Sequence, residues 1–380
     1  MPSPYFSPEH ELLRAQVRRF VDEEVADAGD RWEARGEVPR EVLRKMGALG
    51  MLGIRYPARF GGSELDTLAT VVLAEELGRS TFGGFAITVL VHTDMASPHL
   101  ANAGTEAQKS RYLPAVIAGD AITAVAITEP DAGSDVAGIR TRATRRSGRW
   151  VLDGTKMFIT NGVNADLYFV AAKTATEGPR SRAITMFVVE RGTPGFSVAR
   201  PLAKMGWRSS DTAELVFDGC ELDESQVLGE VDRGFYAIMK NFQNERIVLA
   251  AQAMGEAARA LELTLEHVRA RRAFGATLWD KGAIRQRIAQ RAAEVEAARQ
   301  LVYHCAWLDA RSIDCTREVS MAKALCGELV NRVMYDCQQF HGGSGYMHGT
   351  AIERMVRDAR VQAIGGGATE VMLEEVAKRL

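Results

Sequence analysis

The sequence lacks several features that would place it in a special class of protein. It has no uninterrupted apolar run of about 18 residues, which a membrane-spanning helix needs. Its N-terminus shows neither a signal peptide pattern nor the acid-poor composition of a transit peptide. Cysteines are few, odd in number at five, and free of CxxC spacing, which predicts reduced thiols and no structural metal. We therefore expect a cytoplasmic protein.

Charge of one sign and clustered histidines are also missing. Forty-seven basic residues face 49 acidic ones, so the overall charge gives no reason to expect a nucleic acid partner. The seven histidines are scattered without ligand spacing, and we expect no bound metal ion. The glycines of "HGGSGYMHG" do not have GxGxxG spacing and follow a helical pattern, which disfavours a nicotinamide-binding Rossmann domain.

Proline is absent from the C-terminal part of the chain. All eleven prolines lie at or before Pro201, so residues 202–380 contain none. Because proline costs about 3 kcal/mol inside a helix, this favours long C-terminal helices. Apolar residues recur there at helical spacing, for example Ile247, Ala250 and Met254. Ser7-Pro8 is a typical helix start in the N-terminal part.

The central part of the chain has a different texture. Between residues 121 and 217, short β-branched and aromatic runs such as "LYFVAAK" and "AITMFVVE" alternate with turn residues, which indicates strands. Asp153-Gly154 predicts a hairpin turn between two of them. We expect an α+β fold with helices in 1–120, a β domain in 121–228 and a helical bundle in 229–380.

Five segments, in order, carry a resemblance to a known family. They are "AVAITEPDAGSDVAGIRTRA", "DGTKMFITNG", "RRAFGATL", "QQFHGGSGYM" and "RDARVQAIGGGATEVM". Taken alone, the first of these is equally well explained as a turn and helix cap. Together they closely resemble the acyl-CoA dehydrogenase family over essentially the whole chain. The resemblance implies a helical domain, a β-barrel-like domain and a four-helix bundle, assembled as a homotetramer with FAD bound between subunits. It further implies α,β-dehydrogenation of an acyl-CoA, with electron-transferring flavoprotein as the electron acceptor.

The resemblance assigns several residues to the flavin half of the cofactor. Thr128 is expected to hydrogen-bond the flavin ring, and Ser134 to lie near the FAD pyrophosphate and the pantetheine of the substrate. Phe158 stands where relatives often stack a tryptophan on the flavin. Thr160, two residues later, is expected to reach flavin N5.

Other residues are implied to bind the distal half of FAD. Arg271 and Phe274 resemble residues that a neighbouring subunit offers, and a guanidinium suits pyrophosphate geometry. Gln339 and Gly343 resemble contacts to the adenosine half. The phosphate and ribose end of the site is completed by Gly367, Thr369 and Glu370.

The catalytic base is expected on a helix rather than in a loop. Many relatives carry a glutamate at the position of Gly366, which cannot act as a base but keeps the backbone N–H that donates to the thioester oxygen. Relatives of the isovaleryl and mammalian long-chain type place the glutamate in a segment resembling "NERIVLA", where this chain has Glu245. It is implied to remove the α-proton while the β-hydrogen leaves as hydride to flavin N5. Arg246 is implied to contact the CoA or order the site.

The residues around Glu245 support that expectation independently. At helical spacing it shares a face with four apolar residues, Ile238, Phe242, Val248 and Leu249. A carboxylate on such a face is either poorly solvated, with a raised pKa, or paired. Arg246 is a poor partner, because adjacent helical residues do not face each other.

Three further expectations stay open on the sequence. Gly365-Gly366 replaces the Tyr-Glu of many relatives, which predicts a wider cavity and tolerance of branched, cyclic or long acyl groups. An oxidase on the same fold would pass its electrons to O2. A catalytically silent acyl-CoA or acyl-carrier binding flavoprotein would need Glu245 to be structural.

Overall fold

The N-terminal part of the chain is helical. The computed structural model describes residues 3–175 and 177–380. The N-terminal helices are α1 (Pro8–Phe20), α2 (Gly29–Arg35), α3 (Arg40–Ala48), α4 (Thr67–Gly78), α5 (Gly83–Leu90), α6 (Ser97–Ala103) and α7 (Glu106–Ala118), with π-helical turns η1 (Val21–Val25) and η3 (Val91–Ala96). α4 is buried along its whole length, as expected of a helix that is apolar on most sides.

Local sequence signals explain where these helices begin. Ser7 caps α1 and Pro8 is its first residue, as predicted. Thr105 and Gln108 form a reciprocal capping box at the start of α7. η3 joins α5 to α6, and Pro98 follows it. Because proline has no N–H, the carbonyl of Asp94 receives no i→i+4 bond and is free for another donor.

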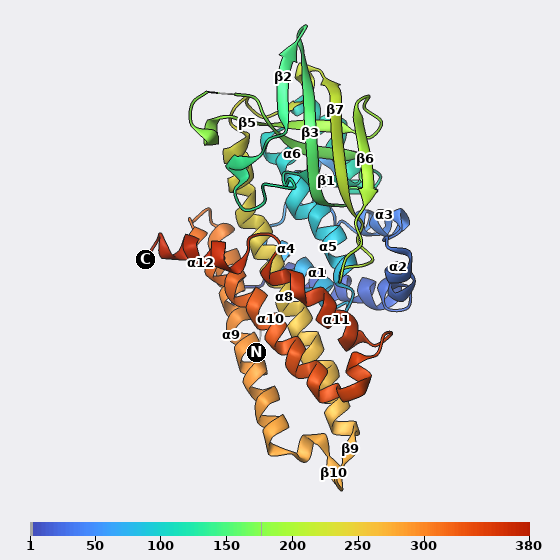
Figure 1. The fold of residues 1–380 in the computed structure, drawn as a ribbon. Helices are drawn as coiled ribbons and strands as arrows, with labels where there is room; N and C mark the ends of the chain where they lie inside the picture. Colours follow the sequence, from blue (N-terminus) through green and yellow to red (C-terminus); the bar gives the residue numbers. More distant parts are fainter. Residues whose placement is uncertain (1–2, 176) are drawn as a thin grey trace.

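The middle part forms one mixed sheet. Its strands are β1 (Thr123–Ala126), β2 (Arg142–Arg146), β3 (Arg149–Thr160), β4 (Leu167–Lys173), β5 (Ile184–Glu190), β6 (Phe196–Pro201), β7 (Thr212–Leu222) and β8 (Val227–Leu228). The strand order is β6-β7-β3-β2-β4-β5-β8, and β1 pairs in parallel with β4. Figure 1 shows this sheet at the end of the molecule opposite the C-terminal helices.

The prediction of a hairpin turn at Asp153-Gly154 is wrong. β3 runs straight through both residues, and Gly154 pairs with Phe217 of β7 beside a register shift. The turn lies instead at Ser147-Gly148, between β2 and β3, where both residues have positive φ. Gly154 serves close packing, because a Cβ there would lie 2.6 Å from the Thr141 hydroxyl. Glycine is favoured both in turns with positive φ and at strand positions where another segment packs closely, so its presence does not distinguish the two.

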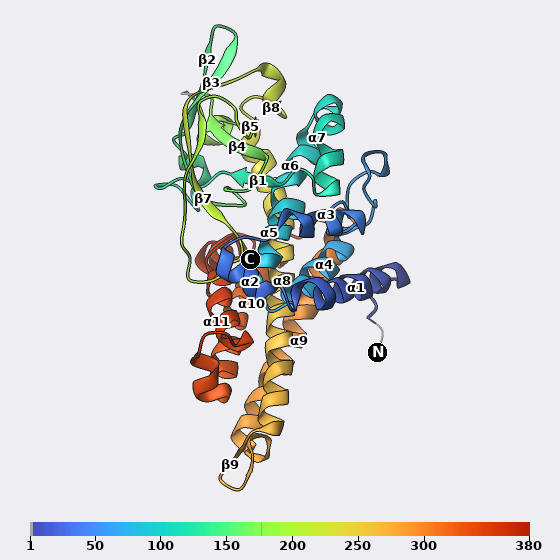
Figure 2. The same ribbon diagram turned by 90° about the vertical axis from the view of Figure 1, so that its right-hand side faces the viewer.

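The C-terminal part is built from long helices, as the missing prolines predicted. α8 (Gly234–Ala270), α9 (Gly282–Asp309) and α10 (Thr316–His341) pack against one another, and α11 (Ala351–Ala359) and α12 (Thr369–Ala377) both pack against α10. A small hairpin, β9 (Arg272–Ala273) and β10 (Ala276–Thr277), joins α8 to α9. α8 runs from the β domain to that hairpin at the far tip (Figures 1 and 2). The α+β class and its three-part order are confirmed.

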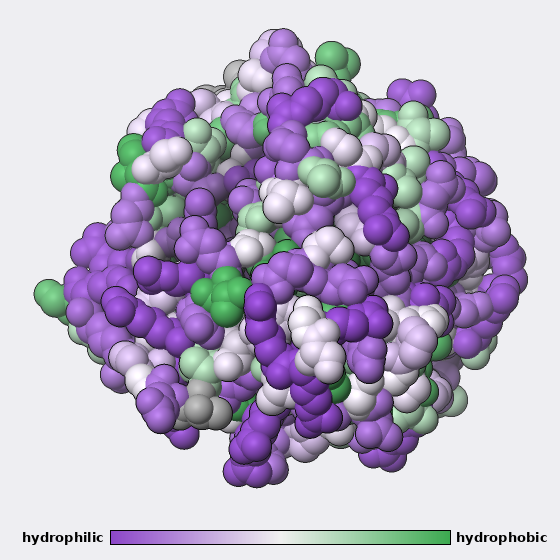
Figure 3. All heavy atoms as spheres, turned by 90° about the horizontal axis from the view of Figure 1, so that it is seen from above, coloured by the Kyte–Doolittle hydropathy of each residue, from purple (hydrophilic) through white to green (hydrophobic). Residues whose placement is uncertain are grey.

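Two further observations concern the polarity of the surface and of the helices. Viewed onto the β domain, Figure 3 shows a mostly hydrophilic face on which apolar residues form small separate spots. Among the residues that the structure describes, none of the helices has the length and apolarity to cross a bilayer.

Candidate active site

Glu245 lies on α8 and is buried, with 7% of its surface exposed. Its Oε1 accepts a hydrogen bond from Nδ2 of Asn241, one turn earlier, at 3.1 Å. Burial raises the pKa of Glu245 to about 8, against smaller lowering effects of the Asn241 hydrogen bond and the Arg246 charge. Ile238, Val248 and Leu249 on the same face are buried too. Such a carboxyl is poised to take up a proton near neutral pH.

Arg246 does not neutralise this carboxyl by an ion pair. Within the described residues its guanidinium has no hydrogen-bond or salt-bridge partner, and its Nε is buried without one. The guanidinium lies over the Phe242 ring, 5.6 Å from the centroid. Burial lowers the pKa of Arg246, while Glu245 and Glu375 act in the opposite direction. A half-buried cation without a partner among the described residues is suited to an anionic ligand.

The glycine loop, residues 365–367, packs against α8 close to Glu245. Gly366 has a φ of 62°, in the left-handed region, and a Cβ on it would overlap Cδ1 of Leu249. Leu249 is one helical turn after Glu245, so the loop faces the same side of α8. The buried Lys323 on α10 fixes the loop by donating to the carbonyls of Gln362 at 2.8 Å and Gly367 at 2.5 Å.

The residues predicted to contact the flavin ring lie at a distortion of β3. Phe158 has a φ of 61° and is 66% exposed, unusual for a phenylalanine inside a strand. A register shift between Lys156 and Ile159 produces this outward turn. Thr160 is partly exposed at the end of β3, and Thr128 is partly exposed just after β1. The Thr128 carbonyl accepts the Met157 N–H at 2.9 Å, which joins the two segments.

A buried ion pair holds these segments in place. Nζ of Lys156, which is fully buried, contacts Oε1 of Glu129 at 2.8 Å and the Ile127 carbonyl at 2.9 Å. The Glu129 carboxylate also accepts the backbone N–H groups of Arg140 and Thr141. Burial acts to raise the pKa of Glu129, but Lys156 and these hydrogen bonds outweigh it, so its pKa is lowered. The pair therefore fixes Thr128, which lies between Ile127 and Glu129.

Hydrogen bonds through η3 connect α8, near Glu245, to the strand that leads into Thr128. Asn241 donates to the carbonyls of Asp94 and Met95 in η3. His92, also in η3, accepts from the backbone N–H of Thr123 in β1, and β1 leads into Thr128. The loop after β1 carries Ser134, which is exposed.

The remaining predicted residues form two groups. Thr369, at the start of α12, donates to Glu328 at 2.9 Å, and Glu370 beside it is exposed; both follow the glycine loop. Arg271 and Phe274 lie at the far tip of α8, and Phe274, 97% exposed with a φ of 52°, forms the hairpin turn.

Gln339 and Gly343 share that tip. Both are exposed near the end of α10, where the rings of His267 on α8 and His341 stack at 4.2 Å. Arg271 follows Glu245 by 26 residues, which at 1.5 Å per residue is roughly 39 Å along α8. One small ligand therefore cannot touch both Glu245 and Arg271 within a single chain.

Comparison with known protein families accounts for most of the chain. Residues 7–120 match the acyl-CoA dehydrogenase N-terminal domain, 124–220 the middle domain and 232–380 the C-terminal domain. The chain belongs to the acyl-CoA dehydrogenase family.

Individual relatives agree with this family assignment. The mitochondrial long-chain specific acyl-CoA dehydrogenase of Rattus norvegicus is 40% identical over 99% of this chain and 87% of its own. The mitochondrial isovaleryl-CoA dehydrogenase of Pongo abelii is 35% identical over 96% and 87%. The crystal structure of an acyl-CoA dehydrogenase from Geobacillus kaustophilus superposes with a TM-score of 0.95 at 38% identity, covering 100% and 99% of the two chains.

FAD is the cofactor of this family member, and structures of other relatives contain FAD or FADH2. The side chains at the predicted sites fit such a ligand. Phe158 presents an exposed ring at a strained backbone position beside the hydroxyl-bearing Thr128 and Thr160. Phe274 presents a second exposed ring next to the cationic Arg271. An exposed aromatic ring can stack on an isoalloxazine ring, and a guanidinium can bind a pyrophosphate.

Sequence reasoning missed the residues that hold the site together. Asn241 could have been found, because it is four residues before Glu245 and therefore on the same helix face. Lys156 and Lys323 carry no such signal, since a lysine in a strand or a helix is usually exposed.

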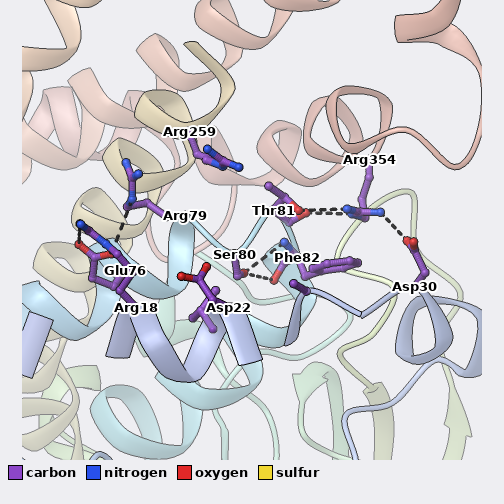
Figure 4. Close-up of a pocket in the computed structure, with 12 residues that line it drawn as sticks. Arg18, Asp22, Asp30, Glu76, Arg79, Ser80, Thr81, Phe82, Arg259 and Arg354 are labelled. Carbon is purple, nitrogen blue, oxygen red and sulfur yellow. Dashed lines mark hydrogen bonds and ion pairs between the residues drawn. The ribbon is translucent and has the colours of Figure 1, made fainter. Parts of the chain in front are cut away.

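A cavity elsewhere in the protein lies apart from the predicted site. It has a volume of about 370 Å³ and lies between α1, α4 and α8 (Figure 4). Its arginines are engaged: Arg18 and Arg79 contact Glu76, and Arg354 contacts Asp30. It contains none of the predicted site residues.

Proposed function

We propose that the protein catalyses the FAD-dependent α,β-dehydrogenation of an acyl-CoA thioester, with Glu245 as the base that removes the α-proton. The observation that supports this most is the buried Glu245 carboxyl, whose pKa is raised to about 8, on the helix face that the glycine loop contacts. A base with that pKa is partly ionised at neutral pH and binds a proton readily.

Two groups of the chain act on the thioester in this proposal. The backbone N–H of Gly366 donates to the thioester oxygen and stabilises the charge that develops there when the α-proton leaves. Glu245 accepts that proton from the adjoining carbon, out of contact with bulk water. FAD bound by these residues would supply the oxidising group, a flavin ring able to take up the β-hydrogen as hydride at N5.

The remaining roles concern binding. Thr128, Phe158 and Thr160 hold the flavin ring, and Ser134 lies by the pyrophosphate and pantetheine. Arg246, which has no protein partner within the described residues, binds the anionic CoA moiety. The rest of FAD is held by Gly367, Thr369 and Glu370 and, from a neighbouring subunit, by Arg271, Phe274, Gln339 and Gly343.

The separation along α8 supports assembly from several chains. Residues roughly 39 Å apart serve one FAD only if two subunits contribute to each site, and a homotetramer provides this arrangement. Electron-transferring flavoprotein is proposed as the electron acceptor.

The acyl group is proposed to be branched, bulky or long. The 35% and 40% identical relatives are named for isovaleryl and long-chain acyl groups. Leu249 occupies the space beside Gly366 that a longer side chain would fill. Its side chain therefore limits the acyl group at this point, and Leu249→Ala is expected to broaden the range of accepted substrates.

The test is anaerobic mixing of the FAD-loaded protein with a panel of straight, branched and long acyl-CoAs. Loss of flavin absorbance with at least one of them is expected, and Glu245→Gln should abolish it. No absorbance change with any member would favour a silent binding protein. Rapid peroxide formation during aerobic turnover would instead favour an oxidase.

A further inference from the structure

Asn241 connects the base to a separate element of the fold. Its Nδ2, which carries two hydrogens, lies within hydrogen-bonding distance of three acceptors: the Met95 carbonyl at 3.0 Å, Glu245 Oε1 at 3.1 Å and the Asp94 carbonyl at 3.3 Å. All three partners are acceptors, so the amide nitrogen, not the oxygen, must face them. Asn241 itself is 5% exposed.

The backbone of η3 makes these acceptors available. Pro98 cannot donate to the Asp94 carbonyl, and the π-helical turn at Val91–Ala96 changes the local bonding pattern. Nδ2 of Asn244 also donates to the Asp94 carbonyl, at 2.8 Å. Asn241 and Asn244 therefore both hydrogen-bond η3 from α8, and Asn241 also donates to the Glu245 carboxyl.

We propose that Asn241 is a positioning residue for the base: its amide, anchored on the carbonyls of η3, fixes the direction of the Glu245 carboxylate and stabilises its ionised form. This inference rests on the proposed function of Glu245. An anchored donor holds one carboxylate oxygen, which leaves the other free for the substrate proton. The hydrogen bond also favours the charged form of Glu245 and thus opposes the effect of burial on its pKa.

Other charged groups near Glu245 differ in their position. Arg246 follows it on α8 and acts through its charge without a hydrogen bond. Asp94 of η3 is buried, with its carboxyl bound to Thr93 and Asn244. The charges that surround Arg246 in turn are Lys323 on α10, Glu375 on α12 and Arg379 just after α12.

The experiment measures the rate of anaerobic flavin reduction against pH in the FAD-loaded protein. Asn241→Ala and Asn241→Leu should move the midpoint of the rate profile upward by about one pH unit, and the plateau rate at high pH should also fall, because the carboxylate is no longer held in one direction. Asn244→Ala is the matched control, because it weakens the same contact to η3 and leaves Glu245 untouched; its midpoint should not move. Asp94→Asn should not move it either.

Three outcomes are distinguishable. Midpoints that stay at the wild-type value in both Asn241 variants, with FAD content and thermal stability retained, would overturn the inference. A midpoint that moves equally in Asn244→Ala would overturn it as well, since the effect would then belong to the α8–η3 contact in general. If Glu245→Gln leaves the wild-type profile unchanged, the proposed function itself fails instead.

Discussion

Moving the base from α8 to the glycine loop requires more than one substitution. In a Glu245→Gln background, Gly366→Glu places a carboxyl where many relatives have one. The structure opposes it twice, because Gly366 has a φ of 62° and its Cβ would overlap Cδ1 of Leu249. The left-handed backbone alone costs about 1–2 kcal/mol for a residue with a Cβ, and Leu249 must also rotate out of a buried position.

We therefore expect little recovery from the double variant and more from a triple one. Loss of the base costs roughly 10²–10⁴ in rate, and Glu245→Gln/Gly366→Glu should regain only a small part of it. Adding Leu249→Ala removes the overlap, and we expect at least about tenfold more recovery, which corresponds to about 1.4 kcal/mol.

The assay is stopped-flow flavin reduction with a straight-chain acyl-CoA, with thermal unfolding of each variant as the control for folding. Equal recovery in the double and triple variants would refute the role of Leu249. No recovery in a stable triple variant would show that the loop does not face the α-carbon.

Three other predictions concern the pH dependence, the ion pair and the hairpin. Because burial raises the pKa of Glu245 to about 8, its carboxyl is mostly protonated below that pH. The flavin reduction rate should therefore rise about tenfold per pH unit up to pH 8 and then level off. A flat rate profile from pH 6 to 9 would contradict this. Lys156→Met leaves the buried Glu129 carboxylate unpaired and should lower the free energy of unfolding, measured by heat or denaturant, by about 3–5 kcal/mol. Replacing Arg145, whose ion pair with Glu224 is exposed, should lower it by less than about 1 kcal/mol. Similar losses in the two variants would refute the role of the buried pair. Phe274→Ala should lower the amount of FAD retained per chain after gel filtration, while Leu12→Ala, at another exposed apolar site, should not; unchanged FAD content in both would argue against a subunit-spanning site.

The fold was predictable where a single physical rule dominates. Prolines are expensive in helices, and the proline-free segment holds α8, α9 and α10. The hairpin prediction failed because Asp153-Gly154 satisfies turn chemistry locally, whereas the position is decided by pairing with β7 and by close contact with Thr141. Those partners are far away in sequence, so no local pattern contains them.

The site was predictable to a similar extent. The apolar face around Glu245 follows from helical spacing, and the structure buries this face. Lys156 and Lys323 were not predictable, because their burial depends on acceptors supplied by other segments: the Glu129 carboxylate and the carbonyls of the glycine loop. The effect of Gly366 was only half predictable, since Leu249 takes up the room beside it.

The central claim is that the Glu245 carboxyl removes a proton from the carbon beside the thioester. It is tested most directly by hydrogen exchange in D2O, using an acyl-CoA that has α-hydrogens but no β-hydrogen, so that oxidation cannot follow. The FAD-loaded wild type should introduce deuterium at the α-carbon, and Glu245→Gln with full FAD content should not. Exchange at the wild-type rate in Glu245→Gln would contradict the claim.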